Sequence, residues 1–296
     1  MTTKNPRFAI FGNAFQNKVP ASASAVISVL HENGADVAVE KSFYNFLSRQ
    51  GAINGNGIGV FERPEFEADY AVSIGGDGTF LRTATTVGTK QTPIIGVNTG
   101  RLGFLAGILP KDIEKAFADI LSHNYIIEKH SAIQIEAEGA KLKGCPYALN
   151  DIAVLKRDIA SMISIHASVN GEYVVTYQAD GLIVSTPTGS TAYSLSNGGP
   201  IIVPQSGTLC LTPVAPHSLN IRPIIISDNS TVTLEVESRS HNFLAAIDGR
   251  SETLADNVAV NISRAPFATN IVKLPGMNYF QSLREKMMWG ADKRRG

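Results

Sequence analysis

The sequence has only two cysteines among its 296 residues, and they stand in segments of different character. Cys145 and Cys210 form no Cys-x-x-Cys or Cys-x-x-His spacing, so the short metal-binding motifs are excluded. A structural disulfide would also be out of keeping with a chain that has no secretory features. We therefore expect two free thiols, each at least half-buried.

Charge of one sign and long apolar runs are also absent. Lysine and arginine number 26, as do aspartate and glutamate, so the net charge is zero and the basic footprint that nucleic-acid binding requires is missing. No segment approaches the roughly 18 apolar residues of a membrane span, and residues 1–6 lack the features of a signal peptide. The sequence predicts a cytoplasmic protein that binds neither nucleic acid nor membrane.

Three catalytic signatures are missing as well. The six histidines have no metal-ligand spacing, so we expect no metal site built from the chain's own side chains. No Gly-x-x-x-x-Gly-Lys-Ser/Thr sequence occurs, which excludes a Walker-type phosphate loop, and no Gly-x-Ser-x-Gly elbow supports a serine hydrolase. Gly55, Gly57 and Gly59 have the wrong spacing for a dinucleotide fingerprint and indicate a flexible loop over residues 51–60.

The first part of the chain alternates strand and helix signals. Short apolar runs predict strands at 8–11, 37–39, 70–74 and 94–97. Helical patterns lie at 20–33, from Thr79 onward, and at 111–124. Strands that alternate with helices favour a doubly wound α/β domain with a parallel sheet.

From about residue 128, strand signals follow one another with few helices between them. They lie at 133–136, 162–165, 174–177, 232–236 and 258–262, and Asn170-Gly171 is a strong hairpin turn. This pattern predicts an all-β, sandwich-like second domain over residues 128–274. A last helix at 278–289 carries an apolar stripe of Phe280, Leu283 and Met287. We expect it to return to the first domain, so that residues 1–127 are completed by 275–296.

The segment Gly75-Gly76-Asp77-Gly78-Thr79 joins a predicted strand to a predicted helix. Glycines let backbone N–H groups approach a phosphate without interference from a Cβ atom, and the helix N-terminus adds a partial positive charge. Phosphate would repel a carboxylate there unless that carboxylate served as a general base or contacted magnesium. The alternative is that Asp77 only caps the helix that begins at Gly78-Thr79.

Three further polar segments stand beside predicted strands. Residues 98–105 follow a strand at the edge where α/β sheets bind ligands. Asn150-Asp151 interrupts an apolar stretch, and these side chains suit an adenine edge and ribose hydroxyls. Residues 180–200 are dense in hydroxyls and glycine, which suits the sugar and phosphates of a nucleotide. Taken alone, each segment is also compatible with an ordinary turn, bulge or loop.

Taken together and in this order, the segments resemble the NAD kinase family. The resemblance also includes Pro216-His217-Ser218-Leu219 with Arg222-Pro223, and the ending Leu283-x-x-Lys286-x-x-Trp289-Gly290. It covers most of the chain from residue 69 to residue 290, whereas residues up to 68 match only in general character. The resemblance implies an α/β domain, a β-sandwich-like domain and a returning helix. It also implies transfer of the γ-phosphoryl group of ATP to the 2′-hydroxyl of the adenosine ribose of NAD.

The same resemblance assigns roles to residues by position. Asp77 would accept the hydroxyl proton, and a divalent ion, Mg²⁺, would bridge the ATP phosphates. The residues implied to bind the nucleotides are Asp77, Gly78, Arg82, Asn150, Asp151, Asp180, Thr188, Thr191, Ala192, Tyr193, Ser194, Leu195 and Ser196. Ser161, Gln178, Ala215 and Arg250 fall where the family has further, variable contacts, and many bacterial members have arginine at position 178 and glutamine at 250. A homodimer or homotetramer is expected from the family.

Two alternatives belong to other classes of protein. A lipid or sphingoid kinase shares the Gly-Gly-Asp-Gly motif, but it would be expected to have an apolar entrance or an amphipathic membrane-facing helix, and the sequence has neither. A non-catalytic NAD(P)-binding regulator of the same fold would not need Asp77 as a base.

Overall fold

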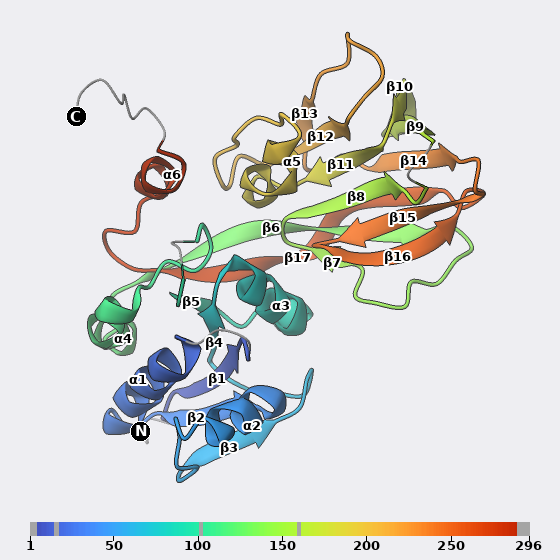
Figure 1. Cartoon of the computed structure of the whole chain (residues 1–296). Helices are drawn as coiled ribbons and strands as arrows, with labels where there is room; N and C mark the ends of the chain where they lie inside the picture. The colour runs from blue at the N-terminus through green and yellow to red at the C-terminus, as the bar shows by residue number, and fades with distance from the viewer. Residues whose placement is uncertain (1–4, 15–17, 101–102, 159–160, 289–296) are drawn as a thin grey trace. The chain divides into compact units, whose positions relative to one another are not determined.

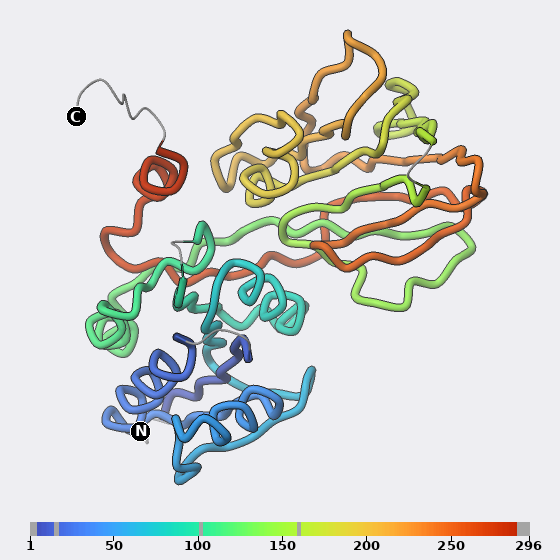
Figure 2. Tube along the Cα trace, in the orientation of Figure 1, coloured from blue at the N-terminus to red at the C-terminus, as the bar shows by residue number. Residues whose placement is uncertain are grey.

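The computed structural model describes residues 5–14, 18–100, 103–158 and 161–288, and the chain divides into two compact units. The first comprises Met1–Glu128 and Asn270–Gly296, and the second comprises Lys129–Thr269. The chain passes between the units within two long strands that pair with each other, β6 (Ile126–Ala137) and β17 (Val260–Lys273). Figure 2 traces this course, in green on the way out and in red on the return.

A parallel sheet forms the centre of the first unit. Its strand order is β3 (Ile58–Phe61), β2 (Asp36–Glu40), β1 (Arg7–Gly12), β4 (Tyr70–Gly75) and β5 (Ile94–Asn98), and the end of β17 joins β5 in parallel. Every residue of β4 and β5 is buried, as expected for parallel strands that are covered on both faces. Their last residues, Gly75 and Asn98, are partners in register. The two segments that follow these strands therefore begin side by side.

The helices of the first unit cover this sheet (Figure 1). They are α1 (Val19–Glu32), α2 (Lys41–Arg49), α3 (Asp77–Val87) and α4 (Ile113–Leu121), with short 3-10 turns η1 (Gly88–Lys90) and η2 (Pro110–Asp112). The last helix of this unit, α6 (Tyr279–Met287), lies apart from the sheet. Helices α1 and α4 pack against each other. The ring of Phe117 on α4 lies 6.3 Å from that of Phe8 on β1, in the apolar core of the unit.

Two antiparallel sheets form the second unit. One has the order β13 (Ile224–Ser227), β12 (Thr208–Val214), β11 (Gly181–Ser185), β8 (Asp151–Lys156), β15 (Asn242–Ile247) and β16 (Arg250–Ala255). The other contains β10 (Glu172–Ala179), β9 (Ile163–Val169), β14 (Val232–Glu237) and β17, with β6 and β7 (Tyr147–Ala148). Residues from both sheets, such as Ile165 and Phe243, form one buried cluster. Between β11 and β12 lie η3 (Thr188–Thr191) and α5 (Tyr193–Ser196).

The predicted fold class is confirmed: an α/β unit, a β-rich unit and a C-terminal helix that belongs to the first unit. The predicted Asn170-Gly171 turn connects β9 to β10, and both residues have positive φ, at 53° and 81°. Positive φ at both central positions is typical of a type I′ hairpin. Both cysteines are free, with Cys145 half-buried and Cys210 buried.

The predicted loop at 51–60 is wrong at its end, because β3 begins at Ile58 and pairs with β2 in register with Val37. Gly55, Gly57 and Gly59 favoured a loop, but pairing with β2 outweighs glycine's low strand propensity, although Gly59 and Val60 are exposed. Helix α2 was not predicted either, since its buried residues are only Phe43 and Leu47.

The predicted C-terminal helix is confirmed over Tyr279–Met287, with the side chain of Asn278 accepting a hydrogen bond from Phe280 N. The expected apolar stripe is wrong for two of its three members. Leu283 is buried, but Phe280 is 48% exposed and Met287 is 37% exposed. Trp289 lies outside the described residues. Across the described part of the chain, no helix has the length and apolarity that a bilayer crossing requires.

Candidate active site

The turn after β4 makes Asp77 the first residue of α3. Gly76 is the N-cap residue, and no side-chain hydrogen bond caps this end of the helix. A Cβ atom on Gly75 would lie 2.4 Å from Oγ1 of Thr79, so a larger residue does not fit there. A Cβ atom on Gly76 or Gly78 would meet nothing within 4 Å. The turn is therefore tightly packed where the strand ends and open where the helix begins.

The Asp77 carboxylate accepts hydrogen bonds from three successive backbone N–H groups. Phe104 N donates to Oδ2 at 2.8 Å, and Leu105 N and Ala106 N donate to Oδ1 at 3.1 and 3.2 Å. Nζ of Lys286 on α6 is a fourth donor, 3.3 Å from Oδ2. The alternative that Asp77 only caps its own helix is therefore wrong. The side chain binds a neighbouring segment and is still 33% exposed.

The segment that binds Asp77 is the second polar motif predicted from the sequence. Asn98 is fully buried and fixes this segment from the end of β5: its Nδ2 donates to Ala106 O at 3.2 Å, and its Oδ1 accepts from Gly100 N at 2.8 Å. A Cβ atom on Gly103 would lie 1.9 Å from Oδ1 of Asp77. Glycine at 103 is thus required for the carboxylate to reach the N–H groups. Arg101 and Leu102 lie outside the described residues.

Lys286 was not predicted as a site residue. Its ammonium group lies 3.8 Å from the ring centroid of Phe104 as well as beside Asp77, and its side chain is 15% exposed. Burial lowers the pKa of Lys286, and the nearby Asp77 carboxylate opposes this effect. The sequence feature that could have revealed Lys286 was its place in the C-terminal Leu283-x-x-Lys286 pattern, but no role was predicted for it.

Two other predicted residues of the first unit, Gly78 and Arg82, lie on α3. Both are exposed, and Nη2 of Arg82 donates to Oγ1 of Thr79 at 3.4 Å. They stand in the first turns of an eleven-residue helix, where the helix dipole favours an anion. Both are therefore accessible to a phosphate group at this end of α3.

In the second unit, Asn150 lies in a bend between β7 and β8, and Asp151 begins β8. The backbone N–H groups of Leu149, Asn150 and Asp151 donate to the carboxylate of Asp248 at 2.8, 2.8 and 3.1 Å. Oδ1 of Asn150 is buried and has no hydrogen-bond partner within the described structure. The backbone is thus a turn, as one alternative had it, and the Asn150 amide oxygen is left without a partner.

Two buried carboxyl groups face this bend. Burial raises the pKa of Asp151 to about 7, and the charge of Asp248 acts in the same direction. Burial also raises the pKa of Asp248, against the opposing effect of its three backbone donors and of Arg250. Asp248 was not predicted from the sequence. The sequence feature that could have revealed it is the Asp248-Gly249 pair. This pair forms a hairpin turn between β15 and β16, with φ of 46° and 77°.

Arg250 is half-buried, and its guanidinium group binds the backbone around the same bend. It donates to Ile247 O at 3.1 Å, to Cys145 O at 3.2 Å and to Tyr147 O at 2.7 Å. The side chain therefore ties the strand that leads to Asn150 to the hairpin that carries Asp248.

Residues 180–200 fold as β11, η3 and α5, and several of their hydroxyls serve the fold itself. Thr186 Oγ1 donates to Leu149 O at 2.6 Å, Ser190 Oγ donates to Pro187 O at 2.7 Å, and Ser194 Oγ lies 2.8 Å from Oγ1 of Thr212. Among the predicted contacts, Ser194 is buried, Thr188, Thr191, Ala192 and Leu195 are half-buried, and Tyr193 and Ser196 are exposed.

The close approach of η3 to the Asn150 bend brings two predicted segments together. A Cβ atom on Gly189 would lie 2.0 Å from Asn150 O, so glycine is required at this contact. Thr188 begins the same turn, and its Oγ1 lies 2.8 Å from Nδ1 of His130. Asn150, Asp151 and η3 therefore form one group in the second unit.

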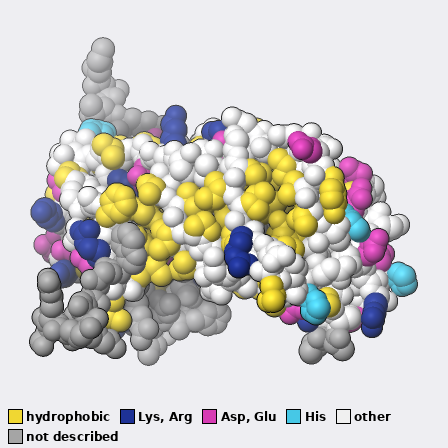
Figure 3. Space-filling view, turned by 90° about the horizontal axis from the view of Figure 1, so that it is seen from above, with side chains coloured by type: hydrophobic (Ala, Val, Ile, Leu, Met, Phe, Trp, Pro, Cys, Tyr) yellow, Lys and Arg dark blue, Asp and Glu magenta, His cyan; other side chains and the backbone are white. Residues whose placement is uncertain are grey.

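The remaining predicted residues lie outside this group. Asp180 pairs with Lys156 at 2.7 Å, and Ala215 is exposed with φ of 44°. Gln178 lies on β10 of the other sheet and Ser161 precedes β9, and both line a surface hollow. Glu237, Arg239, His241 and Asp256 line the same hollow. In Figure 3, acidic and histidine side chains gather at one end of the face it draws.

Two family models match most of the chain. The ATP-NAD kinase N-terminal domain matches residues 8–125, and the ATP-NAD kinase C-terminal domain matches residues 149–274. The NAD kinase of Bacteroides fragilis is 51% identical over 288 residues, which cover 97% of this chain and 99% of that protein. The NAD kinase of Porphyromonas gingivalis is 41% identical over 285 residues, which cover 96% and 98%. The chain belongs to the NAD kinase family.

Solved structures agree with this NAD kinase in fold. Yeast NADH kinase, complexed with NADH, has a TM-score of 0.88 at 22% identity and covers 100% of this chain and 91% of that one. An NAD kinase from Archaeoglobus fulgidus, in complex with ATP, has a TM-score of 0.70 at 25% identity, with coverage of 94% and 99%. The predicted function, phosphoryl transfer from ATP to the 2′-hydroxyl of NAD, is confirmed by the family and its relatives. The comparisons support neither a lipid or sphingoid kinase nor a non-catalytic regulator.

Replacing Gly103 by alanine tests the packing around Asp77. The new Cβ atom would lie 1.9 Å from Oδ1 of Asp77, so the carboxylate must move. We expect kcat of the NAD kinase to fall about 100-fold, the usual effect of misplacing a reacting group by about 1 Å. Gly100→Ala is the matched control, because its Cβ atom would come no closer than 3.9 Å to Oδ1 of Asn98. Similar activities of the two variants would contradict the packing argument.

Replacing Asp151 by asparagine tests the buried carboxyl pair. The folded-state pKa of about 7 lies above the ordinary value of 3.8, so the folded state binds the proton more strongly. In the wild type, the contribution of Asp151 to the unfolding free energy is therefore fully present below about pH 4, and it is lost as the pH rises through 7. Relative to wild type, the variant should gain unfolding free energy between pH 5 and pH 8, by up to roughly 3 kcal/mol. Urea unfolding at both pH values measures this, and an unchanged difference between the proteins would refute it.

Proposed function

We propose that Asp77 is the general base of phosphoryl transfer. One of its oxygens accepts the proton of the 2′-hydroxyl of NAD as the hydroxyl oxygen bonds to the γ-phosphorus of ATP. The bond from that phosphorus to the β–γ bridging oxygen breaks, and ADP leaves. The position of Asp77 supports this role, because it follows β4 at the carboxyl edge of a parallel sheet, where α/β proteins bind ligands.

The hydrogen bonds around Asp77 also support this role. Backbone N–H groups of three residues fix the carboxylate before a substrate arrives, so little reorganisation is needed in the reaction. A third of the side chain is exposed and accessible to a hydroxyl group.

The start of α3 is the phosphate site in this proposal. The open space at the Cβ positions of Gly76 and Gly78 lets a phosphate approach the backbone N–H groups there. Gly78 and Arg82 contact the bound nucleotides from this turn. The negative charge of Asp77 beside the phosphates is offset by its backbone donors and by Lys286.

Magnesium enters this proposal as part of the nucleotide. Mg²⁺ is usually bound through substrate phosphates, one or two carboxylates and several waters, rather than in a cage of protein ligands. Among the described residues, no group of three or more histidine, cysteine or acidic side chains is arranged to hold a metal ion. When bound, the ion neutralises charge on the phosphates.

The second unit binds NAD in this proposal, and the unpartnered Oδ1 of Asn150 is the observation that carries it. A buried acceptor without a donor is rare and costly. An exocyclic amino group, as on adenine, would satisfy it. Asp151, Thr188 and residues 191–196 line the same region, and Asp180, Ser161, Gln178 and Ala215 are further contacts. Arg250 acts indirectly, since its guanidinium group holds the backbone around the bend.

The family resemblance extends the proposal to a cytoplasmic homodimer or homotetramer. Light scattering coupled to size-exclusion chromatography measures the assembly, and a monomer at micromolar concentration would contradict this part.

Replacing Asp77 by asparagine tests its role as base. We expect kcat to fall by about 10²–10⁴-fold, the usual contribution of general base catalysis. Calorimetry should give a Kd for NAD close to that of wild type. The asparagine NH₂ group would face a backbone donor, so thermal unfolding is measured in parallel to detect displacement of residues 104–106. Turnover near the wild-type rate in the folded variant would remove Asp77 from the mechanism.

Replacing Asn150 by alanine distinguishes a ligand contact from a structural role. Because Oδ1 has no partner in the described structure, its removal should leave the unfolding free energy unchanged or higher. Loss of one hydrogen bond to the substrate should raise KM for NAD roughly 2- to 10-fold, with a smaller effect on KM for ATP. A destabilised variant with equal changes in both KM values would indicate a structural residue.

A further inference from the structure

Helix α6 brings an ammonium group to the candidate base. Nζ of Lys286 lies 3.3 Å from Oδ2 of Asp77 and 3.8 Å from the ring centroid of Phe104. Transfer of a lysine from water to a half-buried position is unfavourable unless an anion or an aromatic face compensates for the lost hydration. Here both are present, and both belong to the segments that form the Asp77 site. The contact is therefore specific rather than a chance surface pair.

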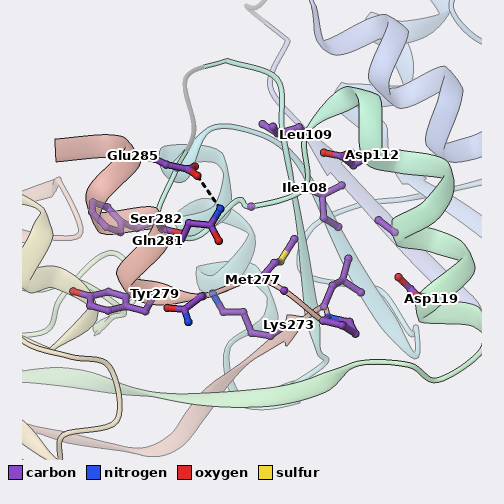
Figure 4. Close-up of a pocket in the computed structure, with 18 of the residues that line it drawn as sticks. Ile108, Leu109, Asp112, Asp119, Lys273, Met277, Tyr279, Gln281, Ser282 and Glu285 are labelled. Atoms are coloured by element: carbon purple, nitrogen blue, oxygen red, sulfur yellow. Dashed lines mark hydrogen bonds between the residues drawn. The ribbon is translucent and has the colours of Figure 1, made fainter. Parts of the chain in front are cut away.

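Most side chains of α6 are exposed. Leu283 is its buried side chain, one helical turn before Lys286 and on the same face. Beside this contact lies a cavity of about 330 Å³, lined by Gln281, Ser282 and Glu285 of α6 and by residues of α4 and of the segment before α6 (Figure 4). Lys286, Leu283 and Tyr279, whose ring lies 6.2 Å from that of Phe104, all contribute to the attachment of α6.

The charge of Asp77 makes a fourth donor necessary. A carboxylate beside a phosphate site is repelled by the phosphates, and the repulsion tends to turn it away. The three backbone donors lie in one segment, residues 104–106, with a single one on Oδ2. An ammonium group on Oδ2 opposes this repulsion. It also has three N–H groups, so it can keep contact with Oδ2 while a substrate hydroxyl approaches.

We propose that Lys286 is a positioning residue for phosphoryl transfer, which holds Oδ2 of Asp77 in place and couples α6 to the reaction. The proposal rests on the role of Asp77 as base. Nothing in phosphoryl transfer itself requires a helix from the far end of the chain; the observed contact gives that helix a function.

Neutral substitutions of Lys286 test the proposal. Lys286→Met keeps the apolar stem, and we expect kcat to fall about 10- to 100-fold, with KM for NAD changed less than about threefold. Lys286→Arg should retain more activity than Lys286→Met, because it keeps the cation. Arg284→Met is the matched control: Arg284 is an exposed cation on the same helix, and its loss should leave kcat unchanged.

Chemical rescue separates positioning from simple anchoring of α6. Lys286→Ala leaves space at the carboxylate, and millimolar ethylammonium should restore kcat several-fold, whereas tetramethylammonium, which has no N–H group, should not. Retention of wild-type kcat by Lys286→Met, or equal recovery with the two cations, would overturn the proposal. A failure of the proposed role of Asp77 as base would be distinguishable from a failure of this proposal, because the Asp77→Asn variant would then keep the wild-type kcat.

Discussion

Three consecutive backbone N–H groups face the carboxylate of Asp77, and the candidate site of the first unit depends on this contact. The contact is possible because β4 and β5 are neighbours with Gly75 opposite Asn98, so that the segments after them start together. Asn98 fixes the path of the second segment, and Gly103 leaves room for the carboxylate. Lys286 donates a second hydrogen bond to Oδ2 and connects the C-terminal helix to the same side chain.

The second unit contains the same kind of contact. There the carboxylate of Asp248 accepts hydrogen bonds from Leu149, Asn150 and Asp151, again three consecutive residues. In both units a carboxylate from one segment fixes the backbone of another at the end of a strand. A charged acceptor makes stronger hydrogen bonds than a neutral one, which suits a segment that must keep its shape around a ligand. In the second unit the ordered bend holds the buried amide oxygen of Asn150, which has no hydrogen-bond partner in the described structure.

The fold was predictable where a local pattern is strong. The apolar runs of β4 and β5 and the hairpin at Asn170-Gly171 are visible in the sequence because burial and turn geometry constrain the residue types directly. The Asp77 turn and the Asn150-Asp151 pair were also predicted, the first from doubled glycine between a strand and a helix and the second from a polar pair that interrupts an apolar stretch. Strand β3 was missed because its pairing with β2, and not its own composition, makes it a strand.

Other parts of the site depend on contacts that no local pattern reveals. Lys286 reaches Asp77 across 209 positions, and Asp248 reaches Leu149 across 99. The hydroxyl-rich residues 180–200 show a related difficulty. Composition indicated ligand contacts, but it cannot distinguish a hydroxyl that binds a ligand from one, such as that of Ser194, that binds within the fold.

The most direct test of the central claim is a double-mutant cycle between Gly103 and Asp77, measured as the single-turnover rate of phosphoryl transfer to NAD. If residues 103–106 act by holding the Asp77 carboxylate, Gly103→Ala should slow the wild-type enzyme about 100-fold and the Asp77→Asn enzyme less than about threefold, because coupled residues are not additive. The same slowing in both backgrounds would contradict the claim, because Gly103 would then act independently of the carboxylate.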